Sequence, residues 1–194
     1  MLKVEAPAGA KDILLHACCA PCSGASLECL RESGIRPLLF FSNSNITPRE
    51  EYDLRLGELR RYAALMGVAL VEDAYDHAAW LQAVRGLEDE PERGRRCEAC
   101  FRFRLGRAAR YAAEQGLPVL ATTLASSRWK DLDQVNRAGA EACTATGEAV
   151  AFWPQNWRKG GLQERRNAVL REQCFYNQTW CGCEFSRQQP SKPI

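Results

Sequence analysis

The chain has 194 residues, of which 46% are hydrophobic and 26% charged, a composition typical of one globular domain. No apolar run approaches the roughly 20 residues that a membrane helix needs, and charged residues interrupt any secretory signal. The formal net charge is only +2, so charge alone does not identify a nucleic-acid-binding protein. We therefore expect no membrane partner and a cytoplasmic location, where thiols stay reduced.

Short apolar strands and amphipathic helices alternate along the chain. The predicted elements are strand 12–15, helix 24–32, strand 37–41, helix 48–66, strand 68–71, helix 75–84, helix 97–114, strand 119–122, helix 131–145, strand 150–153 and helix 162–171. A capping box of Thr47 and Glu50 is expected to start the second helix. The alternation predicts an α/β fold, a three-layer Rossmann-like domain with a parallel sheet of about five strands. We expect a single domain over 1–194, with its core at 12–186 and a disordered tail at 187–194.

Ten cysteines are a large number for a chain of this length. Three are solitary and are expected to be small buried hydrophobes: Cys29, Cys143 and Cys174. The other seven form three tight groups, namely Cys18, Cys19 and Cys22, then Cys97 and Cys100, then Cys181 and Cys183. In a reducing compartment, metal, cluster or redox chemistry explains such groups better than a disulfide scaffold does.

The spacing and position of these thiols indicate metal ligands. Cys97 and Cys100 are separated by two residues at a predicted helix start, which allows both to bind one ion or cluster. The first group follows the first strand, where the carboxyl ends of parallel strands form ligand sites. Cys19 and Cys22 alone would suit a thioredoxin-type pair, but seven thiols exceed that need. They divide into four plus three: a cluster with a neighbouring mononuclear metal, or a cluster with a redox dithiol.

Other residues near these turns have two interpretations each. His16 ends the first strand, either as a histidine that bonds the backbone or as a proton donor. The aromatic and basic loop 152–161 suits either the grip on unpaired RNA bases or a hydrophobic plug for the sheet edge. The segment 93–110 is strongly basic, and its charges are arginines, which favour phosphate contacts.

An ordered set of motifs resembles the QueH-type epoxyqueuosine reductase family, from about residue 13 to residue 186. The motifs are His16-x-Cys18-Cys19-x-Pro21, Asn43-x-Asn45-Ile46-x-Pro48-x-x-Glu51-Tyr52-x-x-Arg55, Glu90-Pro91-Glu92-x-Gly94-x-Arg96-Cys97-x-x-Cys100-x-x-x-Arg104-Leu105, Thr122-Thr123-Leu124, Arg158-Lys159-Gly160 and Cys181-Gly182-Cys183-x-Phe185-Ser186. The resemblance implies an enzyme that acts on tRNA carrying epoxyqueuosine at the wobble position. It would remove the epoxide oxygen to give queuosine, the last step of that modification, without cobalamin.

The resemblance also implies a [4Fe–4S] cluster with a second metal, iron, close by. The cluster ligands would be Cys18, Cys19, Cys97 and Cys100. Cys181 and Cys183 would form a redox pair or share the second metal, with Cys22 as its third ligand. His16, Tyr52 or a bound water would protonate the leaving oxygen. The tRNA anticodon loop would meet Asn45, Arg104, Arg158 and Lys159, and an unidentified donor would supply electrons.

Two other functions remain open from the residues alone. A thiol–disulfide oxidoreductase using Cys19 and Cys22 would be colourless and active on disulfides. A zinc-stabilised RNA-binding module would hold about one zinc per chain and no iron.

Overall fold

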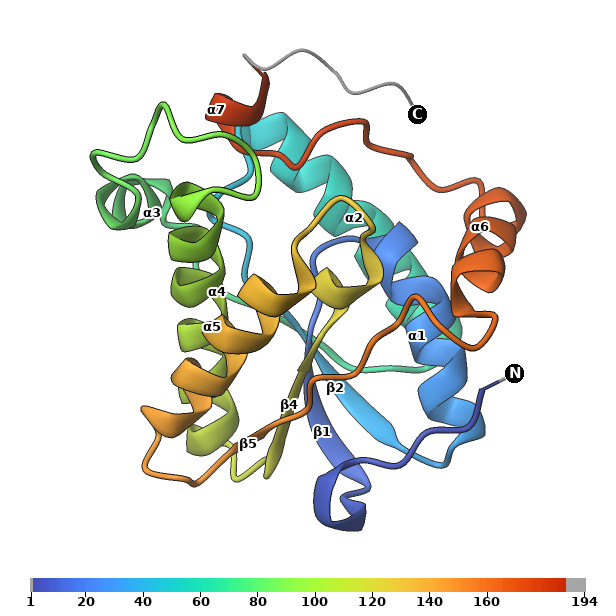
Figure 1. Ribbon diagram of the computed structural model, residues 1–194. Helices are drawn as coiled ribbons and strands as arrows, with labels where there is room; N and C mark the ends of the chain where they lie inside the picture. Colours follow the sequence, from blue (N-terminus) through green and yellow to red (C-terminus); the bar gives the residue numbers. More distant parts are fainter. Residues whose placement is uncertain (1, 188–194) are drawn as a thin grey trace.

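Within residues 2–187, which the computed structural model describes, five parallel strands form the centre of the fold (Figure 1). Their order across the sheet is β3-β2-β1-β4-β5, and every neighbouring pair is parallel. The strands are β1 (Asp12–His16), β2 (Arg36–Phe41), β3 (Leu70–Glu72), β4 (Val119–Thr122) and β5 (Ala151–Phe152). The central strands are nearly continuous apolar runs because helices bury both faces of the sheet. The α/β prediction with about five strands is confirmed. Of the predicted tail 187–194, Arg187 ends the helix Glu184–Arg187, and residues 188–194 lie outside the described residues.

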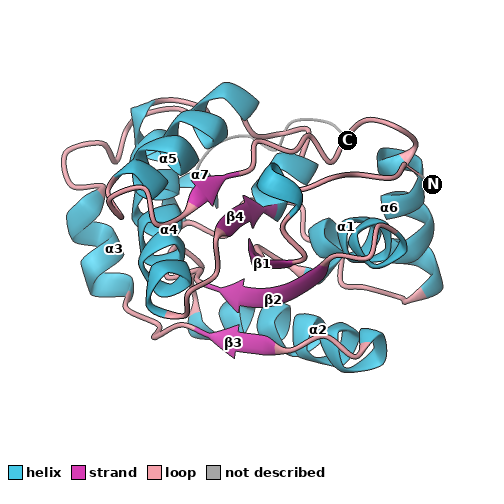
Figure 2. Cartoon of the chain, turned by 90° about the horizontal axis from the view of Figure 1, so that it is seen from below, coloured by secondary structure: helices cyan, strands magenta, loops and turns pink. Residues whose placement is uncertain are grey.

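Helices cover the two faces of the sheet (Figure 2). They are α1 (Ala20–Glu32), α2 (Arg49–Met66), α3 (His77–Ala83), α4 (Arg95–Glu114), α5 (Leu132–Thr144), α6 (Leu162–Glu172) and the short α7 (Glu184–Arg187), with 3-10 turns η1 (Pro7–Gly9) and η2 (Thr123–Ser126). The first face carries α1, α2 and α6, and the second carries α4 and α5 with α3 beside α4 (Figure 1). None of the helices in the described part of the chain is both long and apolar enough to cross a membrane.

Two helices begin earlier than predicted. The first helix begins at Ala20 rather than at residue 24, because Pro21 suits the first helical turn, where its missing N–H costs no hydrogen bond. Cys22 is therefore a helical residue. The fourth helix begins at Arg95 after Gly94, which places Cys97 and Cys100 two residues further into the helix than expected.

The predicted capping box of α2 is wrong. The helix begins at Arg49 after a cis Thr47–Pro48 peptide, and no side chain caps it. The backbone N–H of Thr47 instead donates a hydrogen bond to the carbonyl of Gly182, at 3.0 Å. The residue before the cis proline, at the start of α2, is thus hydrogen-bonded to a segment more than 130 residues further along the chain.

The strand order creates one opening at the carboxyl end of the sheet. The chain leaves β1 toward β2 and β3, and later returns to place β4 on the other side of β1, with His16 opposite Thr122. The segments that follow β1 and β4 therefore run in opposite directions. Such a topological switch point is where open α/β sheets bind their ligands.

Candidate metal centre

All seven clustered cysteines line the same cavity, which has a volume of about 630 Å³ and lies at this switch point. The cavity is walled by the segments after β1, β2 and β4, by the first turns of α4, and by the chain leading into α7. The three groups come from positions nearly 80 residues apart in the sequence. The fold thus brings together the thiols that sequence spacing had only grouped locally.

The first-turn thiols form the tightest group. The sulfur atoms of Cys18, Cys19 and Cys22 all lie within 4.8 Å of one another, and all three residues are buried. The Thr123 hydroxyl donates to the Cys18 sulfur at 3.3 Å, and the Gln178 amide donates to the Cys19 sulfur at 2.8 Å. Donors aimed at sulfur stabilise thiolates, the form in which cysteine binds a metal.

The two cysteines of α4 bridge the other groups. Cys97 packs against the hydrophobic cluster that contains the first-turn thiols, whereas Cys100 belongs to the cluster of Cys183, against which Cys181 packs. The backbone N–H of Arg93 donates to the Cys97 sulfur at 3.3 Å. The first turns of α4 therefore place two thiols in the same cavity as the other two groups.

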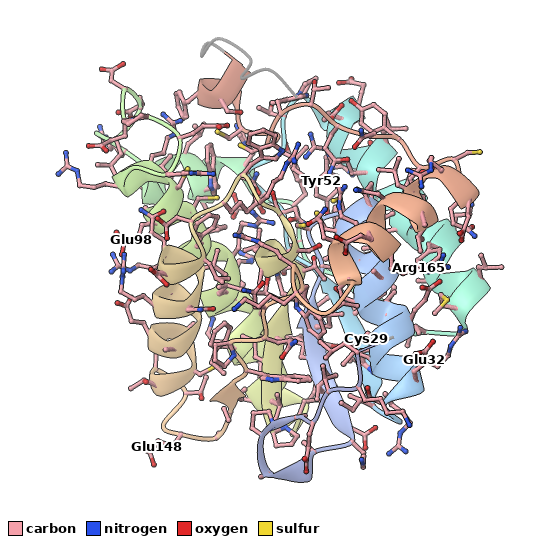
Figure 3. The ribbon with its side chains drawn as sticks, turned by 45° about the vertical axis from the view of Figure 1, so that its right-hand side comes forward. Cys29, Glu32, Tyr52, Glu98, Glu148 and Arg165 are labelled. Atoms are coloured by element: carbon pink, nitrogen blue, oxygen red, sulfur yellow. The ribbon has the colours of Figure 1, made fainter. Side chains whose placement is uncertain are left out.

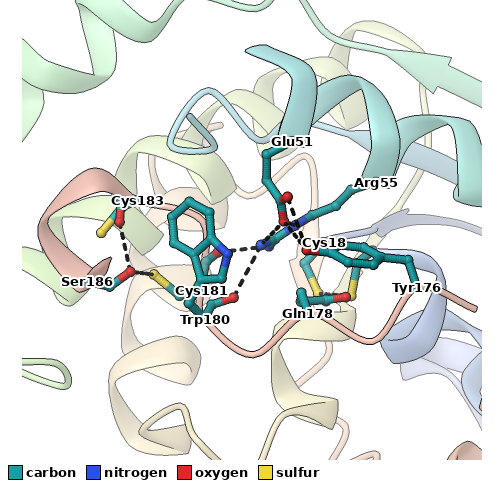
Figure 4. A network of polar contacts seen from close by, with 10 residues as sticks. Cys18, Glu51, Arg55, Tyr176, Gln178, Trp180, Cys181, Cys183 and Ser186 are labelled. Atoms are coloured by element: carbon teal, nitrogen blue, oxygen red, sulfur yellow. Dashed lines mark hydrogen bonds and ion pairs between the residues drawn. The ribbon is translucent and has the colours of Figure 1, made fainter. Parts of the chain in front are cut away.

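The Cys181-Gly182-Cys183 segment is held by a buried arginine (Figure 4). Arg55 donates to the carbonyls of Cys181 and Trp180 at 3.1 and 3.2 Å, and pairs with Glu51 at 2.6 Å. Gly182 has φ +108°, a conformation that L side chains rarely adopt, and a Cβ there would approach an Ile46 carbon to 2.9 Å. Glycine between the two thiols is thus required by the backbone and by its neighbours.

Charge in the cavity is distributed unevenly among the sulfurs. Hydrogen bonds from the Cys19 and Cys22 thiols hold the pKa of Cys18 well below its usual value. A hydrogen bond from Cys183, with the Lys130 charge, likewise lowers the pKa of Cys181. Burial disfavours the Lys130 ammonium, but the Cys181 and Cys18 sulfurs outweigh it and raise the pKa of Lys130. Each thiol group therefore favours one thiolate beside a shared cation.

The residues present fit a thiolate-bound metal group. Seven soft sulfur ligands in one cavity are the donor set of zinc or iron–sulfur sites rather than of magnesium or calcium. In the described part of the chain, several buried polar atoms of the cavity wall have no hydrogen-bond partner: Asn45 Oδ1, Trp80 Nε1, Arg96 Nε and Nη2, and Gln178 Oε1. Orphaned polar groups of this kind are rare in a finished structure. Such unpaired polar atoms are expected where a polar or charged ligand binds.

Two of the predicted tRNA-contacting residues line the cavity. Asn45 follows β2 and lies in the wall. Arg104, from α4, is buried, and its guanidinium binds the Ser42 carbonyl at 3.2 Å and the Asn43 side-chain oxygen. Arg104 therefore supports the segment after β2 as well as placing a charge at the cavity.

The two predicted proton donors are buried outside the cavity lining. His16 is fully buried, with Nδ1 2.8 Å from the Thr122 hydroxyl and Nε2 3.2 Å from the Ser42 carbonyl. Burial lowers its pKa to about 3, so the ring is neutral at pH 7. Tyr52 packs in the core against Phe41, and burial raises its pKa to about 12. Among residues 2–187, neither belongs to the set that lines the cavity. These environments oppose proton donation by either side chain.

The aromatic and basic loop divides between its two interpretations. Trp153 and Trp157 are buried, and the Trp157 indole donates to the Thr122 carbonyl at 3.0 Å. Their rings belong to the hydrophobic core and are not free to stack on RNA. Arg158 is half-buried and donates to two backbone carbonyls, whereas Lys159 is exposed. The aromatic side chains are thus the hydrophobic plug, and RNA contact by the two basic residues stays a prediction.

The solitary cysteines lie apart from the cavity. Cys29 is buried low on α1, toward the opposite end of the sheet, and its thiol donates to the Leu2 carbonyl (Figure 3). Cys143 is buried on α5, where burial raises its pKa to about 12. The expectation of burial is wrong for Cys174, which is exposed just after α6.

Four residues of the site were not assigned a role from sequence. Lys130 and Gln178 lie outside every quoted motif and offered no signal. Thr123 and Arg55 lie inside motifs, but only the folded chain shows that they support Cys18 and the Cys181 segment. Polar residues that support ligands are invisible to spacing rules because their partners are remote in the chain.

Fold and site together define a Rossmann-like α/β protein with a thiol-rich candidate metal centre at its switch point. A family profile described as epoxyqueuosine reductase QueH matches residues 13–189. The chain is 43% identical over 190 residues to the epoxyqueuosine reductase QueH of Histophilus somni, covering 98% of this chain and 78% of the relative. Identity is 40% to the same enzyme of Haemophilus influenzae (98% and 77% coverage) and 32% to that of Thermotoga maritima (90% and 89%). The chain belongs to the family of epoxyqueuosine reductases QueH.

Proposed function

We propose that this protein removes the epoxide oxygen of epoxyqueuosine at the wobble position of tRNA and so produces queuosine. The observation that carries the proposal is the convergence of seven thiols on one cavity in a chain that matches this family over nearly its whole length. A plain RNA-binding module needs four thiols at most for one zinc. Seven thiols suit a centre that also transfers electrons.

We assign a [4Fe–4S] cluster to Cys18, Cys19, Cys97 and Cys100. When bound, the cluster would supply electrons one at a time at low potential. Cys181 and Cys183 are the redox pair or, with Cys22, hold a second metal such as iron. Support for the assignment comes from Cys97, which packs against the hydrophobic cluster that contains the first-turn thiols, and from Cys100, which lines the same cavity.

The dithiol alternative balances the reaction. Removing an epoxide oxygen as water breaks both C–O bonds, forms a C=C bond, and consumes two electrons and two protons. Oxidation of the Cys181 thiolate and the Cys183 thiol to a disulfide releases two electrons and one proton, and solvent supplies the second proton. An external reductant must then reduce the disulfide. Because Cys183 is the thiol of raised pKa in this pair, it retains its proton and is the better donor of the two.

The cavity wall supports a polyanionic substrate. Arginine and lysine side chains outnumber carboxylates among its residues, and Arg104 and Lys130 lie within it. The modified base must leave the anticodon stack to reach buried thiols, as in other enzymes that act on a nucleobase. We assign Asn45 and Arg104 to the base and its sugar–phosphate, and Lys159 to the RNA backbone outside the cavity.

Anaerobic purification followed by iron, sulfide and zinc analysis and an absorption spectrum tests the cofactor. We expect a brown protein with about four sulfides per chain. Cys97→Ala should lose most of the iron, whereas the buried control Cys143→Ala should keep it. Conversion of epoxyqueuosine to queuosine in purified tRNA, followed by mass spectrometry of nucleosides, tests the activity.

The remaining functions give different results in the same experiments. A colourless protein with about one zinc and no iron would replace the proposal by a zinc-stabilised RNA-binding module. A metal-free protein that reduces disulfides through Cys19 and Cys22 would replace it by a thiol–disulfide oxidoreductase.

A further inference from the structure

An exposed tryptophan lies at the edge of the thiol cavity. Trp129, in the segment between η2 and α5, lines the cavity, yet its side chain is 44% exposed. The guanidinium of Arg128 lies over its ring, 4.7 Å from the centroid. A large aromatic surface left in water beside a functional cavity indicates a partner that covers it.

The backbone that carries this tryptophan is fixed by two arginines from distant segments. Arg93 donates to the carbonyls of Arg128 and Trp129 at 3.0 and 2.9 Å. Arg158 donates to the carbonyl of Lys130 at 3.0 Å. Three consecutive carbonyls are therefore held, while the indole itself stays exposed. The position of the ring is set before any ligand arrives.

The arginine that holds the tryptophan backbone is itself held in place. Arg93 has φ +68°, a left-handed conformation that residues other than glycine rarely adopt. Its carbonyl accepts a hydrogen bond from the Gln134 amide at 2.7 Å. Strained backbone of this kind concentrates at functional sites. The chain thus uses an unfavourable conformation to hold an exposed ring.

The surroundings select the chemistry of the partner. Within the described part of the chain, Arg93, Arg128, Lys130 and Arg166 border the same cavity, and the Asp131 carboxylate is engaged as the cap of α5. An aromatic face with several cations is the combination that grips unpaired nucleotides, by stacking on bases and pairing with phosphates. A purely apolar partner would leave these charges unpaired.

We propose that Trp129, with Arg128 over its ring, is a stacking platform for an unpaired nucleotide next to the modified base. This inference rests on the proposed function and deepens it, since it names where the anticodon loop is held. The tryptophans of the loop 152–161 are buried and therefore cannot stack on a nucleotide. Arg158 contributes by holding the backbone next to Trp129.

The test is binding of an unmodified anticodon stem-loop RNA, measured by fluorescence anisotropy. Trp129→Ala should raise the Kd roughly 10-fold, because a base–aromatic stack is lost, and Trp129→Phe should recover most of the affinity. Leu65→Ala, which removes an exposed apolar side chain from α2, should bind as the unaltered protein does. Binding of an RNA duplex of equal length should not depend on Trp129, because its bases are stacked within the helix.

Other outcomes would refute the proposed stacking role of Trp129. Wild-type affinity for the stem-loop in Trp129→Ala would show that no base stacks there, even if tRNA turnover is normal, and the proposed function would stand. Equal losses in the alanine and phenylalanine variants, with a lowered Tm, would assign the residue to folding. If the unaltered protein neither binds the stem-loop nor converts epoxyqueuosine in tRNA, the proposed function fails and the platform fails with it.

Discussion

Replacing Arg55 by alanine should both destabilise the protein and loosen its C-terminal thiols. The ion pair with Glu51 is almost fully buried, with side-chain exposures of 4% and 10%. Removing one partner of a buried pair costs about 3–5 kcal/mol, because the other charge is left without compensation. The carbonyls of Trp180 and Cys181 also lose their donor. We expect a loss of about 4 kcal/mol, which lowers Tm by about 10 °C for a domain of this size.

Urea denaturation gives the free energy of unfolding, and alkylation followed by mass spectrometry gives the reactivity of individual thiols. Cys181 and Cys183 should react faster in Arg55→Ala because their segment is no longer held. Arg60→Ala is the matched control, since Arg60 also lies on α2 and pairs with Glu72, but with 54% and 38% exposure. An exposed pair is worth less than about 1 kcal/mol.

A second variant separates charge burial from anchoring. Replacing both partners, by Glu51→Gln with Arg55→Met, should regain much of the stability but leave the alkylation rate high. If Arg55→Ala costs no more than Arg60→Ala, and the thiols react as in the unaltered protein, the buried ion pair does not hold this segment and the reasoning is refuted.

Three further predictions concern other parts of the molecule. Gly182→Ala should lower the free energy of unfolding by about 1–3 kcal/mol, because residue 182 has φ +108°. Gly57→Ala is the control: Gly57 is exposed within a helix, and its replacement should raise the free energy of unfolding by about 0.5 kcal/mol. Equal changes of Tm in the two variants would contradict the strain at residue 182. Burial opposes the charge of Asp73, but hydrogen bonds from an arginine and a serine outweigh it and lower its pKa. Its folded pKa lies below the unfolded one, so its contribution to stability is full above about pH 4 and is lost as pH falls through the folded pKa. Asp73→Asn should therefore flatten the acid limb of unfolding free energy against pH, and an unchanged limb would oppose the assignment. Lys159→Ala should weaken tRNA binding and reduce its salt dependence by about one phosphate contact, and Arg158→Ala should weaken binding and lower Tm as well. If both leave Kd and turnover unchanged, their assignment to RNA is wrong.

Local sequence features were enough to predict most of the elements and the three groups of thiols. The apolar run of β1 and the Cys18-Cys19 pair after it lie within a few residues, so strand, turn and thiols were readable together. The helix starts were less readable. Pro21 extended α1 upstream, and Thr47 used its backbone for a remote contact instead of capping α2. A helix start depends on which partner takes the free backbone groups, and that partner can be anywhere in the chain.

The loop 152–161 shows that amino-acid composition alone does not predict which aromatic side chains are exposed. Trp153 and Trp157 alternate with basic residues just as an RNA-binding loop would, yet both rings are buried in the core. Trp129, flanked in sequence by Arg128 and Lys130, is the ring that remains exposed at the cavity. Burial is a property of packing between remote elements, so no local pattern distinguishes these residues.

The sequence by itself determined an α/β sheet, three groups of thiols, and the family whose motifs they form. Only the tertiary structure decided that the groups share one cavity, because that depends on the placement of β4 beside β1 and on the return of the C-terminal segment. The structure also decided which polar residues support them. Arg55 reaches carbonyls about 125 residues away, and such a contact exists only after the chain has closed on itself.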